Sequence, residues 1–220
     1  MEVRKNKCIY TVITDNYNTL NEPKCTLEGW DLICFTDDPT LTSTTWQIEV
    51  IPEEFIKGLC PKKTSRLFKI LSSVFMREYE WEVYVDGNVE ILSDPTPLLN
   101  QDYTIQTMRH PARKCIYEEG LAVQKYKFEE NDLIIKQMNQ YISDGFPEKL
   151  GLGQNCVLIQ YVDDNLLKFQ SAWWEEVKKW SYRDQLSFMY AIWKTDTKYN
   201  LIPEATFNNY FKKSFGRDGK

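Results

Sequence analysis

The hydrophobic positions of this chain follow two repeating patterns. Short apolar runs bounded by Asp, Asn and Pro are typical of buried strands, and they occupy residues 8–14, 30–36, 81–85 and 156–161. Longer segments repeat apolar residues every three or four positions, which predicts helices within residues 61–79, 132–142, 164–180 and 181–193. This alternation favours an α/β sandwich with a central, mostly parallel mixed sheet flanked by helices.

Polar side chains follow three of the predicted strands. Residues 14–17 follow the first strand, Asp37 and Asp38 the second, and Asp86 with Asn88 the strand at 81–85. Ligands of such sheets bind beyond the carboxyl ends of the strands. We therefore expect these groups to converge on one crevice.

Asp86 and Asn88 are two positions apart at a strand end, so their side chains point the same way from extended backbone. Mn²⁺ and Mg²⁺ take oxygen ligands, usually one or two carboxylates together with substrate phosphates. The pattern predicts a metal at Asp86 and Asn88 that holds a diphosphate. Because Asp-Gly and Gly-Asn also form tight turns, a turn without a metal is the alternative. Thr14-Asp15-Asn16-Tyr17 has the same alternative, a turn with a helix cap.

Basic residues occur near these strand ends. Arg66 and Lys69 are one turn apart on the helix before the strand at 81–85, where they could pair with a diphosphate or form a solvated face. His110 is the one histidine, in a loop with further basic residues that include Arg113. A sugar or anion contact and a structural role are both open for it. Residues 181–184 fit a capping box for the following helix.

Composition narrows the function classes. The 220 residues carry 27 Lys plus Arg against 32 Asp plus Glu, a net charge of −5 without a basic tract, which argues against nucleic acid as a partner. Six irregularly spaced cysteines predict reduced thiols. With no leader-like start and no apolar run near the roughly 18 residues of a membrane span, we expect a soluble, cytoplasmic protein. No phosphate loop, nucleophile elbow, zinc-protease motif or dinucleotide fingerprint is present.

Taken in order, the segments resemble glycosyltransferases of the GT-A fold, in particular the glycogenin and galactosyltransferase-like group. The loop Thr14-Asp15-Asn16-Tyr17 resembles the family's loop that touches uracil. The segment Ser65-Arg66-Leu67 resembles the family's helix that carries a basic residue. Asp86-Gly87-Asn88 stands at the Asp-x-Asp position. The segments 153–157, with Asn155, and Asp184-Gln185 are similar to those that contact the donor sugar. Residues 29–38 and 84–88 also resemble a plant and bacterial glycosyltransferase-like family and small chlorella-virus glycosyltransferases.

The resemblance implies one domain over residues 1–220, with a nucleotide and metal half at about 1–100 and a donor-sugar and acceptor half at about 101–220. It implies metal-dependent transfer of a hexose or deoxyhexose from a UDP-sugar to a carbohydrate acceptor, with retained configuration. Asp184 and Gln185 would act at the reacting sugar, and His110 and Arg113 are further donor contacts. The viral relatives would imply a viral protein in the host cytoplasm.

Two departures from the family pattern keep alternatives open. The second acidic ligand is replaced by Asn88, and the C-terminal histidine ligand has no counterpart in residues 206–220. Asn208, Asn209 or water would have to replace the histidine, and Lys212, Lys213 and Arg217 could close over the diphosphate or form a frayed tail. The alternatives are a catalytically silent nucleotide-sugar-binding domain and a sugar-phosphate nucleotidyltransferase.

Overall fold

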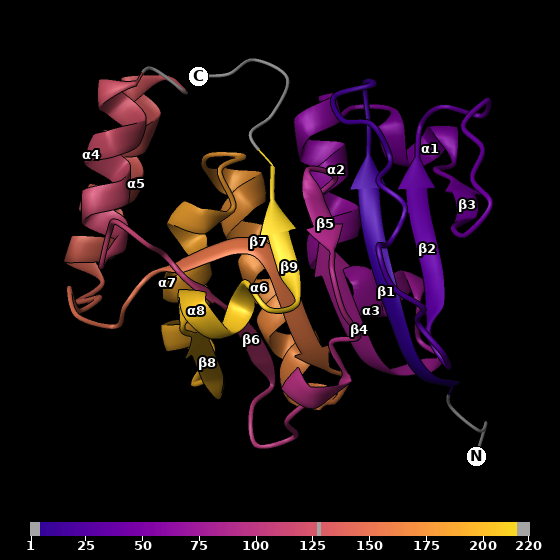
Figure 1. Ribbon diagram of the computed structural model, residues 1–220. Coiled ribbons are helices and arrows are strands. Elements are labelled where there is room, and N and C mark those ends of the chain that lie inside the picture. Colours follow the sequence, from indigo (N-terminus) through magenta and orange to yellow (C-terminus); the bar gives the residue numbers. More distant parts are fainter. Residues whose placement is uncertain (1–4, 127–128, 215–220) are drawn as a thin grey trace.

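The structure is a computed structural model that describes residues 5–126 and 129–214. A seven-stranded sheet with the order β3-β2-β1-β4-β7-β6-β8 runs through the molecule (Figure 1). Its strands are β1 (Lys5–Ile13), β2 (Asp31–Thr36), β3 (Gln47–Val50), β4 (Tyr79–Val85), β6 (Ile105–Arg109), β7 (Gly153–Tyr161) and β8 (Tyr199–Ile202). Neighbouring strands pair in parallel except at β7, which is antiparallel to both β4 and β6. The predicted fold class is confirmed.

Most helices pack on one face of the sheet. The helices are α1 (Glu53–Ile56), α2 (Pro61–Ile70), α3 (Ser72–Phe75), α4 (Ile116–Lys125), α5 (Asn131–Ser143), α6 (Asp164–Lys179), α7 (Gln185–Thr195) and α8 (Glu204–Phe207), with a 3₁₀ turn at Thr96–Leu98. Cys8, Tyr10 and Val12 of β1 belong to the core that contains α2 and α4 to α7. The alternate residues Ile9 and Ile13 face the other core, as expected for a strand with two buried faces.

A small second sheet and α8 cover that other face. It consists of β5 (Val89–Ile91) and β9 (Phe211–Lys213), which pair antiparallel. Val89, Phe207 and Phe211 contribute to the second core. The end of the described chain is thereby brought next to the segment that follows β4 (Figure 1).

The antiparallel direction of β7 positions the site. Because β7 runs against β4, its first residues lie beside the last residues of β4, with Val157 opposite Val85. The amide of Asp86 donates to the carbonyl oxygen of Cys156 at 2.8 Å. Residues 153–156 therefore lie at the same edge of the sheet as Asp86 and Asn88.

The helix predicted over residues 61–79 is wrong in its second half. It ends at Ile70, and only the short α3 follows before β4 begins at Tyr79. Ser72 and Ser73 donate to a carboxylate oxygen of Glu82, a fully buried residue of β4. Burial raises the pKa of Glu82 to about 8, because the charged form is poorly solvated there. The buried acid and its serine partners favour two short helices over one long one.

The two predicted starts of the later helices have different outcomes. Asp163 caps α6, since its carboxylate accepts from the amide of Leu166 at 2.8 Å. The capping box at residues 181–184 is wrong. Helix α7 begins at Gln185, and Asp184 makes no side-chain bond to its first turn because basic residues of α2 hold its carboxylate. Within the described residues, no helix is long and apolar enough to cross a membrane.

Candidate functional site

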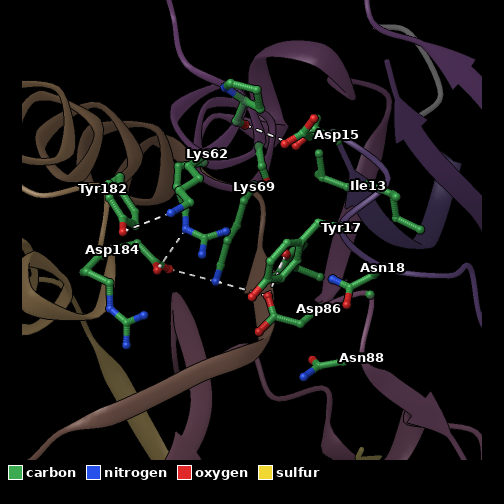
Figure 2. Close-up of a pocket in the computed structure, with 18 of the residues that line it drawn as sticks. Ile13, Asp15, Tyr17, Asn18, Lys62, Lys69, Asp86, Asn88, Tyr182 and Asp184 are labelled. Carbon is green, nitrogen blue, oxygen red and sulfur yellow. Dashed lines mark hydrogen bonds and ion pairs between the residues drawn. The ribbon is translucent and has the colours of Figure 1, made fainter. Parts of the chain in front are cut away.

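A pocket of about 440 Å³ lies at the carboxyl ends of β1 and β4, beside α2 and the start of α7 (Figure 2). Its volume lies within the range of small-molecule sites. The pocket brings together ten of the residues predicted from sequence, namely Thr14, Asp15, Tyr17, Arg66, Lys69, Asp86, Gly87, Asn88, Asp184 and Gln185. The expectation that the strand ends share one crevice is met by the first strand and the strand at 81–85.

Lys69 is the buried centre of the pocket's charge network. Its side chain is 2% exposed, and its ammonium lies 2.8 Å from a carboxylate oxygen of Asp184 and 3.6 Å from Oδ1 of Asp86. The same ammonium donates to the carbonyl oxygen of Asn155 at 2.8 Å and lies 4.7 Å from the ring centre of Tyr84. One cation thus holds β4, β7 and the start of α7 in a fixed arrangement.

Asp184 and Arg66 form the second part of this network. The guanidinium Nε of Arg66 lies 3.1 Å from Oδ1 of Asp184. Burial opposes ionisation of Asp184, but Lys69 and Arg66 outweigh it and hold its pKa below the usual value. Burial likewise opposes the charge of Arg66, and Asp184 outweighs it, so the pKa of Arg66 is raised. Asp184 and Arg66 are therefore both charged at neutral pH.

Asp86 keeps one carboxylate oxygen available to the pocket. Its Oδ1 accepts from the hydroxyl of Tyr84 at 2.8 Å, and its other oxygen has no partner among the described residues. The side-chain nitrogen of Asn88 donates to the backbone oxygen of Ser214 at 3.1 Å, which leaves the amide oxygen of Asn88 without a partner there. Figure 2 places Asn88 next to Asp86.

These two oxygens are a partial donor set for a divalent cation. In residues 5–126 and 129–214 no group of three or more His, Cys, Asp or Glu side chains is arranged to hold a metal ion. Mg²⁺ and similar ions are often held by one or two protein oxygens with substrate phosphates and water as the remaining ligands. Asp86 and Asn88 fit such a site, in which the phosphates complete the coordination. Asn208 and Asn209, the residues expected to replace a histidine ligand, do not line this pocket.

The loop after β1 forms the opposite wall. The amide of Asp15 donates to both carboxylate oxygens of Asp37, at 3.0 and 3.1 Å, and the hydroxyl of Thr14 donates to the carbonyl oxygen of Pro61 at 3.1 Å. Asp15 has a φ of 58°, a left-handed conformation that Asp and Asn tolerate better than most residues. Tyr17, in the same loop, is 71% exposed, so the flat face of its ring is available at the pocket wall.

Sequence reasoning missed part of the lining. Among the residues that it did not select are Asn18, Lys62, Tyr84, Gln154, Tyr182 and Arg183. Lys213, which was expected to close over a diphosphate, does line the pocket, whereas Arg217 lies outside the described residues. The lining holds five basic residues, Lys62, Arg66, Lys69, Arg183 and Lys213, against three acidic ones, Asp15, Asp86 and Asp184. This excess of positive charge suits an anionic ligand.

Four predicted residues lie outside the lining. Asn16 is exposed, and Asn155 is buried with a φ of 58°; neither side-chain polar atom of Asn155 has a hydrogen-bond partner in the described structure. His110 and Arg113 serve the loop after β6 instead. The amides of Ala112 and Arg113 donate to Nδ1 of His110, and Arg113 pairs with Glu119. Burial and the charge of Arg113 lower the pKa of His110.

Gly87 fits where a larger residue would not. A Cβ on Gly87 would lie 2.8 Å from Cβ of Asn18, closer than carbon atoms approach in proteins. We therefore expect Gly87→Ala to lower the free energy of unfolding by about 1–3 kcal/mol, the usual effect of overpacking. Urea unfolding measures it. In Gly87→Ala/Asn18→Gly the opposing Cβ is absent, so the loss should be smaller than the sum of the two single changes. Gly87→Ala with wild-type stability would contradict this packing.

A mostly parallel sheet with a charged pocket at the carboxyl ends of its strands is the arrangement of Rossmann-like glycosyltransferases, and this chain has that fold. The chain belongs to the family of TOD1/MUCI70 glycosyltransferase-like domains, whose sequence profile matches residues 5–215. The resemblance to glycosyltransferases of the GT-A type is thus confirmed, while a viral source stays a prediction. Among curated protein sequences none matches this chain.

A solved structure of similar fold is the bifunctional glycosyltransferase WbbM in its apo form. The TM-score is 0.53 at 11% sequence identity, and the match covers 88% of this chain and 38% of the WbbM chain. This chain therefore corresponds to less than half of that protein, and the likeness concerns the fold alone. Family and fold together support glycosyltransferase activity in general terms.

Proposed function

We propose that this domain transfers a hexose or deoxyhexose from a UDP-sugar to a carbohydrate acceptor and that it depends on Mn²⁺ or Mg²⁺. The observation that carries the proposal is the pocket at the sheet edge, where basic residues outnumber acidic ones around Asp86 in a glycosyltransferase-like domain. A diphosphate has the charge and the size that this lining suits.

The proposed roles follow from exposure and contacts. Arg66 and Lys213 line the pocket without being fully buried, so their charges can reach a diphosphate. Lys69 is enclosed by its partners and acts through them, because it fixes the orientation of Asp86. A metal bound by Asp86, Asn88 and the diphosphate would supply Lewis-acid stabilisation of the departing UDP oxygen.

The nucleoside and sugar ends are assigned on similar grounds. Thr14, Asp15 and Tyr17 line the wall farther along the pocket, and the exposed ring of Tyr17 suits stacking on a base. Gln185 donates from its side chain to the carbonyl oxygen of Gly153 at 2.7 Å, which holds it in place beside Asp184, at the end of the pocket that we assign to the donor sugar. Retention of configuration rests on the resemblance to glycogenin-like enzymes.

Titration calorimetry of UDP and UDP-glucose with and without Mn²⁺ tests the proposal, together with UDP release from UDP-glucose in the absence of an acceptor. We expect binding that strengthens at least tenfold with Mn²⁺, about 1.4 kcal/mol, and slow hydrolysis. Binding without turnover would favour the silent domain, and pyrophosphate-dependent turnover would favour a nucleotidyltransferase. Absence of UDP binding under all conditions would contradict the assignment of the pocket.

A further inference from the structure

A second cavity of about 410 Å³ adjoins the first. Both cavities are lined by Gln154 and Lys213, so these two side chains stand between them. The first cavity lies toward β1 and α2, whereas the second lies toward β6, α8 and β9, on the face of the sheet that carries the small second sheet. A ligand in the second cavity would therefore lie beside a ligand in the first.

The lining of the second cavity combines apolar and hydrogen-bonding groups. Met108, Phe207 and Phe211 are buried members of the second core and contribute its apolar part. Glu204 and Asn208 are exposed at its rim, and their side chains have no hydrogen-bond partner among the described residues. A carboxylate accepts and an amide both donates and accepts, which matches the hydroxyl groups of a sugar. Concave apolar sites with a few polar groups are typical of small-ligand binding.

We propose that this second cavity binds the carbohydrate acceptor, with Glu204 and Asn208 contacting its hydroxyl groups. The inference rests on the proposed function, because it needs the donor to occupy the first cavity. Gln154 and Lys213 then lie where the two substrates meet, and Lys213 can contact the donor diphosphate from one side and the acceptor from the other. The acceptor is defined here as a hydroxyl-bearing sugar unit.

The two cavities differ in a way that assigns the substrates to them. The first carries five of the basic residues named above, which suits two phosphates. The second is lined by two basic residues, Lys212 and the shared Lys213, and it sets the carboxylate of Glu204 against them. A diphosphate gains less there than in the first cavity, whereas a neutral sugar loses nothing by the near balance of charge.

Met108 provides a direct probe of the second cavity. Protein labelled with ¹³C at the methionine methyl groups is titrated with the methyl glycosides of glucose, galactose, mannose, rhamnose and glucuronic acid, with and without saturating UDP and diamagnetic Mg²⁺. At least one glycoside should shift the Met108 signal. Met189 lies in the other core, so its signal should stay in place and serve as the internal reference.

Two rim variants and one neighbour make the test specific. Asn208→Ala and Glu204→Gln should each weaken that glycoside's binding at least about fivefold, the effect of one lost hydrogen bond of about 1 kcal/mol. Asn209→Ala is the matched control, because Asn209 follows Asn208 and does not line the cavity. No shift of Met108 with any glycoside, or wild-type affinity in both rim variants, would overturn the inference. Loss of UDP binding with the Met108 shift intact would instead contradict the proposed function alone.

Discussion

Replacing Lys69 by methionine should lower the free energy of unfolding by about 3–5 kcal/mol and remove activity. The change removes the 2.8 Å partner of the buried Asp184 carboxylate and leaves Arg66, at 3.1 Å, as its ion-pair partner. Removing one member of a buried ion network is strongly destabilising, because the remaining charge is no longer fully compensated. It also frees Asp86 and the carbonyl oxygen of Asn155 from the ammonium that holds them. Urea unfolding at pH 7 measures the loss of stability.

Two further variants separate the buried charge from the loss of a lysine as such. In Lys69→Met/Asp184→Asn the buried carboxylate that lost this partner is also gone, so part of the stability should return. Lys178→Met removes an exposed partner of Glu175, with side chains 52% and 60% exposed, and should change stability by less than about 1 kcal/mol. If Lys69→Met and Lys178→Met unfold alike, the network around Lys69 does not stabilise the fold.

Asp86→Ala should leave the fold intact and lower the rate of sugar transfer or UDP-glucose hydrolysis by about 10²–10³, the usual effect of removing one group that stabilises developing charge. The variant keeps Asp184 and the carbonyl oxygen of Asn155 as partners of Lys69, so the buried ammonium stays paired. It loses the carboxylate proposed for the metal. Initial rates at saturating UDP-glucose and a Mn²⁺ titration of UDP binding measure both effects.

The controls for Asp86 distinguish charge from shape. Asp86→Asn keeps an oxygen at the same place without the charge, and we expect it to fall between Asp86→Ala and wild type in metal affinity. Asp102→Ala removes an exposed carboxylate outside the pocket and should retain full activity. Mn²⁺-dependent UDP binding that survives in Asp86→Ala would show that the metal is held elsewhere or that the strand end is only a turn.

The strands were predictable because their side chains report burial directly. Apolar runs such as residues 81–85 lie in strands with two buried faces, and polar residues mark where these strands end. The antiparallel direction of β7 relative to its neighbours could not be predicted from its sequence, since a short run of buried residues has the same pattern in a parallel and an antiparallel strand. The helix break at Leu71 depends on Glu82, which accepts hydrogen bonds from Ser72 and Ser73, ten and nine residues away, and no local pattern reveals this contact.

Residues of the pocket could be selected from local sequence where they follow a strand end, but the contacts that depend on packing between distant segments could not be foreseen. Asp86 was recognised from its place after an apolar run. Asp184 looked like part of a helix cap, because its partners Arg66 and Lys69 are more than 100 positions away in the sequence. His110 and Arg113 looked like anion ligands because the buried carboxylate of Glu119, which pairs with Arg113, could not be foreseen.

The hydrogen bonds between Ser214 and Asn88 bear on where an affinity tag can be attached. The hydroxyl and amide of Ser214 both donate to the backbone oxygen of Asn88 at 2.8 Å, so the chain passes the rim of the pocket as it leaves β9. A tag fused directly after Ser214 would therefore begin at the rim of the pocket, where a bound ligand would compete with it for space. β1 starts at the opposite end of the sheet (Figure 1), so a tag fused directly before Lys5 would begin away from the pocket.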